Sequence, residues 1–100
     1  MSTDVQFDEK IKVSLQPPTM WKVVFLNDDH TPMEFVMELL TEIFRHSETD
    51  AKNITMEIHN EGSAVAGVYT HEIAEQRGIE STHLARSNGF PLQITIEQES

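Results

Sequence analysis

The side chains best suited to chemistry gather in one polar run, NDDHTP, at residues 27–32. Asn and Asp favour turns because their side chains hydrogen-bond the local backbone, and their oxygens are also acceptors for a cation. The run therefore fits either an acidic turn before a helix or a binding site between a strand and a helix, where sites are often placed. Asp28 and Asp29 are adjacent carboxylates without a third ligand at a fixed spacing, so we predict no metal site.

The histidines are the other candidates for chemistry. They stand on separate segments, at His30, His46, His59, His71 and His83. None forms an HExxH-type spacing, and the chain has no cysteine, no GxSxG motif and no glycine-rich phosphate loop, so we predict no zinc and no cofactor. His59, near a predicted helix end, is either a surface histidine favoured by the helix dipole or part of a site. A small hydrolase that uses Asp28 or Asp29 with His59 is one alternative function.

Hydrophobic patterning predicts the elements on either side of the polar run. Residues 20–26, MWKVVFL, are rich in β-branched and aromatic side chains, which is typical of a strand. After the run, apolar residues recur at intervals of three and four up to Phe44, which predicts a helix with one apolar face. We expect Thr31 to be the N-cap of this helix and Pro32 to occupy its first position.

The rest of the chain predicts two more helices and two more strands. Residues 50–60 fit a strand by their alternating apolar side chains and a helix by an Asp50 cap and by Gly62 just beyond; we favour the helix. Residues 64–69 predict a strand, 70–87 a helix and 90–97 a strand. The order β-α-α-β-α-β predicts an α/β fold of the α+β sandwich type, a three-stranded antiparallel sheet with three helices on one face.

Length and charge limit the classes of function. One hundred residues suffice for one domain, which we place at residues 19–98 after an N-terminal extension, 1–18, that we expect to be flexible. The net charge of −10 argues against nucleic acid and anionic membrane partners, because both are bound through clustered Lys and Arg. The first residues carry acids without an apolar stretch, and no long apolar run occurs, so we expect a cytoplasmic protein and assume a monomer.

Four blocks in a fixed order resemble the ClpS family, the adaptor proteins of the ATP-dependent Clp protease. The blocks are PPTMWKVVFLNDDHTPMEFVMELL at 17–40, HNEG at 59–62, GVYTHEIAE at 67–75 and FPLQITIE at 90–97. The resemblance covers about residues 17–98, and NDDxTPMEFV is its most specific part. It implies a non-catalytic adaptor that recognises proteins whose first residue is Leu, Phe, Tyr or Trp and delivers them to a Clp AAA+ unfoldase, ClpA or ClpC.

The resemblance also implies roles for particular side chains. Contact with the substrate's α-amino group is implied for Asn27, Asp28 and His59. The pocket for the first side chain is implied to comprise Thr31, Met33, Val36, Thr55, Ile58 and Leu92. Met33 matches the residue that excludes β-branched Ile and Val. Docking on the unfoldase's N-terminal domain is implied for His30, Glu72 and Arg77, and residues 1–17 match the extension needed for delivery.

Two positions depart from the family's pattern. Thr55 stands where a large apolar residue, commonly Met, lines the pocket, and its smaller hydroxyl-bearing side chain either widens the pocket or makes it more polar. His30 stands where Tyr is common, so docking strength or its pH dependence is expected to differ. The second alternative function is a ribosome- or chaperone-associated interaction module with the same small fold, since fold alone does not settle function.

Overall fold

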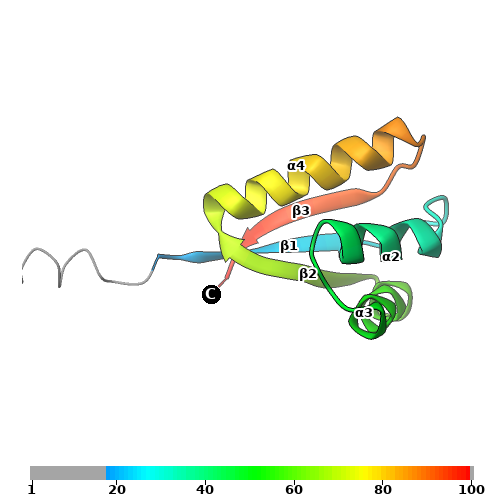
Figure 1. The fold of residues 1–100 in the computed structure, drawn as a ribbon, viewed down its shortest axis with the longest axis horizontal. Helices are drawn as coiled ribbons and strands as arrows, with labels where there is room; N and C mark the ends of the chain where they lie inside the picture. Colours follow the sequence, from blue (N-terminus) through cyan, green and yellow to red (C-terminus); the bar gives the residue numbers. More distant parts are fainter. Residues whose placement is uncertain (1–17, 100) are drawn as a thin grey trace, which may run out of the picture.

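The computed structural model describes residues 18–99. They form β1 (Met20–Leu26), α2 (Met33–Glu42), α3 (Glu48–Glu61), β2 (Ser63–Thr70), α4 (His71–Ser87) and β3 (Gln93–Gln98), in that order (Figure 1). The predicted α+β class and the order β-α-α-β-α-β are confirmed. The predicted extension, 1–18, lies outside the described residues except for Pro18. Between residues 18 and 99, no helix combines the length and apolar character needed to cross a lipid bilayer.

The central strand of the sheet is β1, and its two neighbours pair with it in antiparallel fashion in the order β2-β1-β3. Successive side chains of a strand point to opposite faces, so Val23 and Phe25 lie on the same face, and both are fully buried. At its far end β1 lies beside the starts of both neighbours, because Leu26 pairs with Ser63 and with Gln93. The register therefore gathers three chain segments at one end of the sheet.

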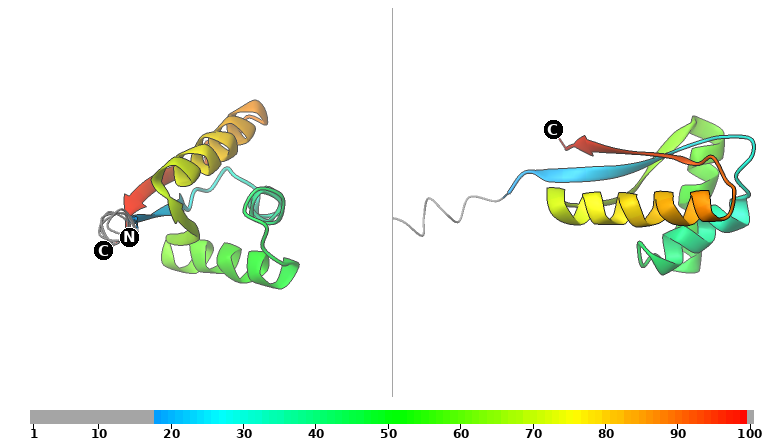
Figure 2. Two further views of the ribbon diagram at one scale, coloured as in Figure 1. Left: turned by 60° about the vertical axis from the view of Figure 1, so that its left-hand side comes forward. Right: turned by 90° about the horizontal axis from the view of Figure 1, so that it is seen from above.

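The helices bury their apolar faces against the side of the sheet that carries Val23 and Phe25. α4 runs alongside β3 and packs against all three strands, whereas α2 and α3 pack against each other, with α3 beside β2 (Figure 1 and Figure 2). Phe44, just after α2, packs edge-on against Phe25 with ring centroids 5.3 Å apart, a geometry that aromatic rings favour. The buried core comprises Val23, Phe25, Val36, Leu39, Leu40, Ile43, Phe44, Ala51, Ile58, Ala64, Ala66, Ala74, Ala85 and Leu92.

The predicted N-caps of α2 and α3 are wrong, although the helices themselves are confirmed. Pro32, not Thr31, is the N-cap of α2, because the Thr31 hydroxyl is committed to a carboxylate earlier in the turn. Ser47, not Asp50, caps α3: the Ser47 hydroxyl accepts a hydrogen bond from the backbone N–H of Asp50 at 3.1 Å. The predicted stop is correct, since Gly62 is the C-cap of α3 in the left-handed conformation.

The last strand is shorter than predicted. β3 begins at Gln93, whereas the sequence predicted a strand from residue 90. The carbonyl groups of Phe90 and Leu92 are bonded to the side chain of Arg86 at the end of α4, so this segment follows the helix rather than the sheet. As a result, a turn precedes β3 and lies at the end of the sheet where Leu26 pairs with Ser63 and Gln93.

Candidate functional site

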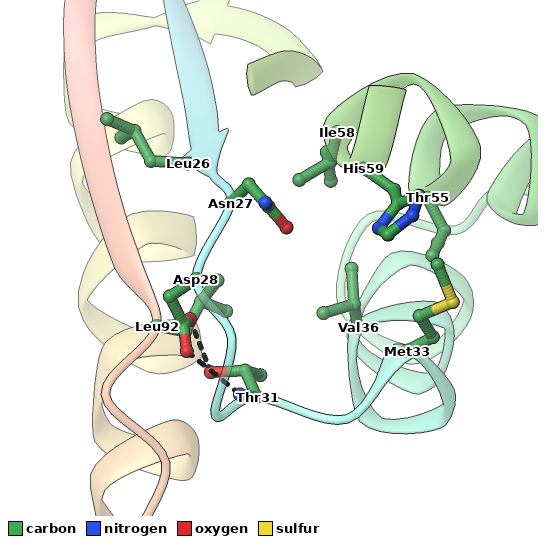
Figure 3. Close-up of a pocket in the computed structure, with 10 residues that line it drawn as sticks. All are labelled: Leu26, Asn27, Asp28, Thr31, Met33, Val36, Thr55, Ile58, His59 and Leu92. Atoms are coloured by element: carbon green, nitrogen blue, oxygen red, sulfur yellow. Dashed lines mark hydrogen bonds between the residues drawn. The ribbon is translucent and has the colours of Figure 1, made fainter. Parts of the chain in front are cut away.

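A cavity of about 280 Å³, including its open mouth, lies where β1 ends. The end of β1, the turn after it, the start of α2, the last turns of α3 and the segment before β3 all contribute to its wall (Figure 3). The lining residues are Leu26, Asn27, Asp28, Thr31, Met33, Val36, Thr55, Ile58, His59 and Leu92. Every side chain that the resemblance assigned to the substrate is in this set. Leu26 was missed, although it ends the predicted strand directly before Asn27.

The Asp28 carboxylate organises the turn between β1 and α2. One of its oxygens accepts hydrogen bonds from the backbone N–H groups of His30 and Thr31 at 2.7 and 2.9 Å, and the other accepts one from the Thr31 hydroxyl at 2.6 Å. Partial burial opposes ionisation, but these hydrogen bonds and the nearby His30 lower the pKa of Asp28 below its ordinary value of 3.8. The carboxylate is therefore ionised at neutral pH and held in a fixed orientation beside the cavity.

Asn27 and His59 face the same opening from opposite sides (Figure 3). Asn27 is the first residue after β1, His59 lies in the last turn of α3, and both side chains are exposed. An amide oxygen and the bare nitrogen of a neutral imidazole are hydrogen-bond acceptors, so these two residues and Asp28 place three acceptor groups around the mouth. In the part of the chain that the structure describes, no group of three or more His, Cys, Asp or Glu is placed to share a metal ion.

The interior of the cavity is apolar. Val36 from α2, Ile58 from α3 and Leu92 from the segment before β3 are all buried and form its wall. Met33, the first residue of α2, is 42% exposed and therefore lies at the mouth. The site thus combines polar acceptors at its entrance with a hydrophobic interior.

Thr55 contributes a small side chain and no free donor. It is buried in the wall, and its hydroxyl donates to the backbone carbonyl of Ala51 at 2.7 Å. The hydroxyl proton is therefore used within α3, one turn earlier in the helix. Of the two effects expected for a Thr at this position, this geometry favours a wider pocket over a more polar one.

Leu92 is held in the wall by contacts from two helices. The Nη1 atom of Arg86 on α4 donates to the carbonyl groups of Phe90 and Leu92, both at 2.9 Å. Phe90 packs edge-on against Phe35 of α2, with ring centroids 4.9 Å apart. These contacts fix the segment before β3, so that the buried Leu92 closes the side of the cavity opposite α3 (Figure 3).

Comparisons with known proteins show the family of the chain. The family described as "ATP-dependent Clp protease adaptor protein ClpS" matches residues 16–95. The chain belongs to the ClpS family. An ATP-dependent Clp protease adapter protein ClpS from Sodalis glossinidius (strain morsitans) is 40% identical over 91 residues, which are 91% of this chain and 86% of that protein. The ClpS of Maricaulis maris (strain MCS10) is 43% identical over 90 residues, 90% of this chain and 83% of that protein.

A solved ClpS structure has the same fold. The structure of Agrobacterium tumefaciens ClpS2 bound to L-phenylalaninamide matches with a TM-score of 0.80 at 44% sequence identity, and the match covers 83% of this chain and 100% of that chain. Membership of the ClpS family makes the chain a Clp protease adaptor and not an enzyme. The hydrolase alternative and the ribosome- or chaperone-associated alternative are therefore set aside.

The residues that the ClpS resemblance assigned to the unfoldase do not form one cluster. His30 lies in the exposed turn after the end of β1. Glu72 is exposed in the first turn of α4, which follows the end of β2 and so lies beside the start of β1. The two are separated by the length of β1, whose 7 residues span about 20 Å at roughly 3.3 Å per residue. Arg77 is half-buried further along α4.

Proposed function

We propose that this ClpS-family chain binds proteins through an N-terminal Leu, Phe, Tyr or Trp and delivers them to a Clp AAA+ unfoldase for degradation. The observation that carries the proposal is the placement of Asn27 and His59 on either side of an opening into an apolar cavity (Figure 3). A protein N-terminus has the two matching parts, an ammonium group and a side chain on the adjacent carbon. The related A. tumefaciens ClpS2 was solved with L-phenylalaninamide, which has the same two parts.

Asn27, Asp28 and His59 are the proposed ligands of the α-amino group. A free α-amino group has a pKa of about 7.7–8.0 and is largely cationic at neutral pH, whereas an internal peptide N–H is neutral with a single donor. Each charge-assisted hydrogen bond to this group contributes about 1.5–3 kcal/mol. Because the Asp28 oxygens already bind the turn, we expect Asp28 to act through its charge, directly or through water, while Asn27 and His59 accept hydrogen bonds.

The first side chain supplies the remaining affinity. An aromatic ring buries about 150–250 Å², which at about 25 cal/mol per Å² amounts to about 4–6 kcal/mol. Association opposes this with at least about 4 kcal/mol of lost translational and rotational freedom. Neither the amine contacts nor the ring alone gives useful binding, and together they correspond to an affinity in the micromolar range. The requirement for both parts explains how the site would select chain ends with large apolar residues.

Two residues are proposed to set the choice among first side chains. Met33 lies at the mouth, where its thioether narrows the entrance and excludes side chains branched at Cβ, namely Ile and Val. Thr55 leaves more room in the wall than the Met that is common in the family. The aromatic residues need that room more than Leu does, so we expect Phe, Tyr and Trp to bind at least as well as Leu.

The proposed unfoldase contact extends from one end of β1 to the other. We infer that the N-terminal domain of ClpA or ClpC contacts His30, Glu72 and Arg77, with residues 1–17 needed for delivery. Because His30 and Glu72 lie at opposite ends of β1, a single domain that touches all three must cover one whole side of the molecule. The monomeric state and the cytoplasmic location, like the division into an extension and a core at 19–98, stay predictions from the sequence.

A titration with matched peptides tests the proposed function. Fluorescence anisotropy is measured with a labelled peptide that begins with Phe and with the same peptide acetylated at its N-terminus. Acetylation removes the positive charge and leaves acceptors at the mouth without a partner, so we expect at least about tenfold weaker binding. Equal affinity for the two peptides would refute recognition of the ammonium group, and a matched peptide that begins with Ser measures the contribution of the ring.

A further inference from the structure

Gly62 connects the two segments that carry Asn27 and His59. It is the C-cap of α3, and its backbone N–H donates to the carbonyl of Ile58 at 2.9 Å. Its own carbonyl accepts a hydrogen bond from the backbone N–H of Asn27, also at 2.9 Å. β2 begins at the next residue, Ser63. One residue therefore joins the end of α3, the end of β1 and the start of β2.

The backbone conformation of Gly62 is one that other residues rarely adopt. Its φ is +91°, in the left-handed region that favours glycine. A Cβ added at this position would meet nothing within 4 Å. The need for glycine here thus comes from the backbone angle and not from crowding, and a substitution would act by moving the peptide groups on either side.

We propose that Gly62 is a positioning residue for recognition of the α-amino group, because its left-handed backbone sets the spacing between Asn27 and His59. Both of these side chains are exposed, so packing does not fix their separation. The direct backbone bond between their segments is the one from Asn27 to Gly62, three residues beyond His59. This inference rests on the proposed function, since it gives Gly62 a part in the same site.

Gly89 provides a matched control. Its φ is +77°, an added Cβ would also meet nothing within 4 Å, and it lies directly after Asn88, the C-cap of α4. Its N–H donates to the carbonyl of Arg86 at 3.0 Å. Gly89→Ala therefore introduces the same kind of backbone strain near the apolar wall, without altering the bond that holds Asn27.

The test compares how strongly each variant distinguishes a free from an acetylated Phe-first peptide. In Gly62→Ala we expect the ratio of the two affinities to fall roughly fivefold or more. The strain of a left-handed Ala would be relieved by moving the carbonyl of residue 62, which accepts the hydrogen bond from the N–H of Asn27. Gly62→Asn is expected to keep most of the ratio, since Asn enters the left-handed region more easily than Ala. Gly89→Ala is expected to keep the wild-type ratio even if its affinity for both peptides falls.

Amide hydrogen exchange at Asn27 gives a readout that needs no ligand. We expect faster exchange of this amide in Gly62→Ala than in Gly89→Ala, and if Gly62→Ala does not fold, Gly62→Ser against Gly89→Ser makes the same comparison. A wild-type ratio, or unchanged protection of Asn27, in folded Gly62→Ala or Gly62→Ser overturns the inference. If the wild-type chain itself does not distinguish the two peptides, the proposed function fails instead, while the exchange rates still decide whether Gly62 holds Asn27.

Discussion

The hydroxyl of Thr31 donates a hydrogen bond of 2.6 Å to the carboxylate of Asp28, and this bond ties the turn after β1 to the mouth of the cavity. Both residues line the cavity, so a contact that stabilises the turn also orients an acceptor of the site. It explains why Thr31, a good helix cap by type, does not cap α2. Three donors converge on one carboxylate, which is how the fold keeps a negative charge in place beside an apolar pocket.

Thr31→Val removes this hydroxyl with almost no change in shape. We expect the pKa of Asp28 to rise toward its ordinary value, because one of the hydrogen bonds that lower it is lost. We also expect the affinity for a Phe-first peptide to fall by about threefold to tenfold, less than the loss of a direct hydrogen bond to a charged group would cause, because this bond only orients Asp28. Carbon-13 NMR of the Asp28 carboxyl measures the first effect. Thr31→Ser keeps the hydroxyl and should behave like wild type; an unaltered pKa in Thr31→Val would contradict the account.

The lowered pKa of Asp28 predicts a pH-dependent contribution to stability. Folding lowers this pKa from 3.8, so ionised Asp28 stabilises the fold above that value, and the stabilisation is lost as the pH falls through the lower value of the folded state. The difference in unfolding free energy between wild type and Asp28→Asn should therefore be larger at pH 7 than well below pH 3.8. Urea denaturation at the two pH values measures it. Asp29→Asn removes the same charge from the adjacent residue, and an equal pH response in both variants would contradict a specific role of Asp28.

Elements were predictable from the sequence where a pattern repeats along the chain. The strand at β1 and the left-handed stop at Gly62 follow from local residue types alone. The two N-caps were predicted wrongly because other hydrogen bonds in each turn decide where the helix begins. The Thr31 hydroxyl is bonded to Asp28, and the N–H of Asp50 is bonded to the Ser47 hydroxyl. These bonds depend on turn geometry, which residue type does not specify.

Which residues share the cavity could not be predicted from the sequence one residue at a time. Spacing placed Asn27 in a turn, but nothing local brought His59 or Leu92 to the same cavity, and their grouping came from the resemblance to ClpS proteins. The physical cause of the grouping is the sheet register, since Leu26 pairs with the first residues of both neighbouring strands. Register is a property of three segments together. For the same reason the sequence predicted Gly62 only as a helix stop.

Gly67 is predicted to be required for stability because the ring of Tyr69 lies over it. A Cβ at position 67 would come within 2.7 Å of the Cε2 and Cζ atoms of Tyr69, so the half-buried ring must move. We expect Gly67→Ala to lower the unfolding free energy by about 1–3 kcal/mol, as overpacking does. A double-mutant cycle in urea checks the cause, because Tyr69→Ala removes the ring. If Gly67→Ala lowers stability equally in both backgrounds, the ring is not the reason.

Arg86 is predicted to support the apolar wall without affecting amine recognition. Arg86→Met removes the donors that hold the carbonyl groups of Phe90 and Leu92, so the wall segment should loosen. We expect the affinity for a Phe-first peptide to fall by about threefold to tenfold, while the ratio between the free and the acetylated peptide stays at the wild-type value. Arg45→Met, which removes the same charge from an exposed position between α2 and α3, is the control. A changed ratio in Arg86→Met would show that the two halves of the site are not independent.

Met33 is predicted to exclude β-branched first residues. Shortening this side chain in Met33→Ala opens the mouth of the cavity. Peptides that begin with Ile or Val should then gain about tenfold or more in affinity relative to the Phe-first peptide, since differences in apolar contact of this kind are worth about 1–3 kcal/mol. Met56 is the matched control: it is 40% exposed against 42% for Met33, lies on α3, and does not line the cavity. Anisotropy titrations with Phe, Leu, Ile and Val peptides measure both variants. If Met33→Ala keeps the wild-type order of preference, or if Met56→Ala admits Ile and Val equally well, the selectivity arises elsewhere in the wall, and Thr55 becomes the next residue to vary.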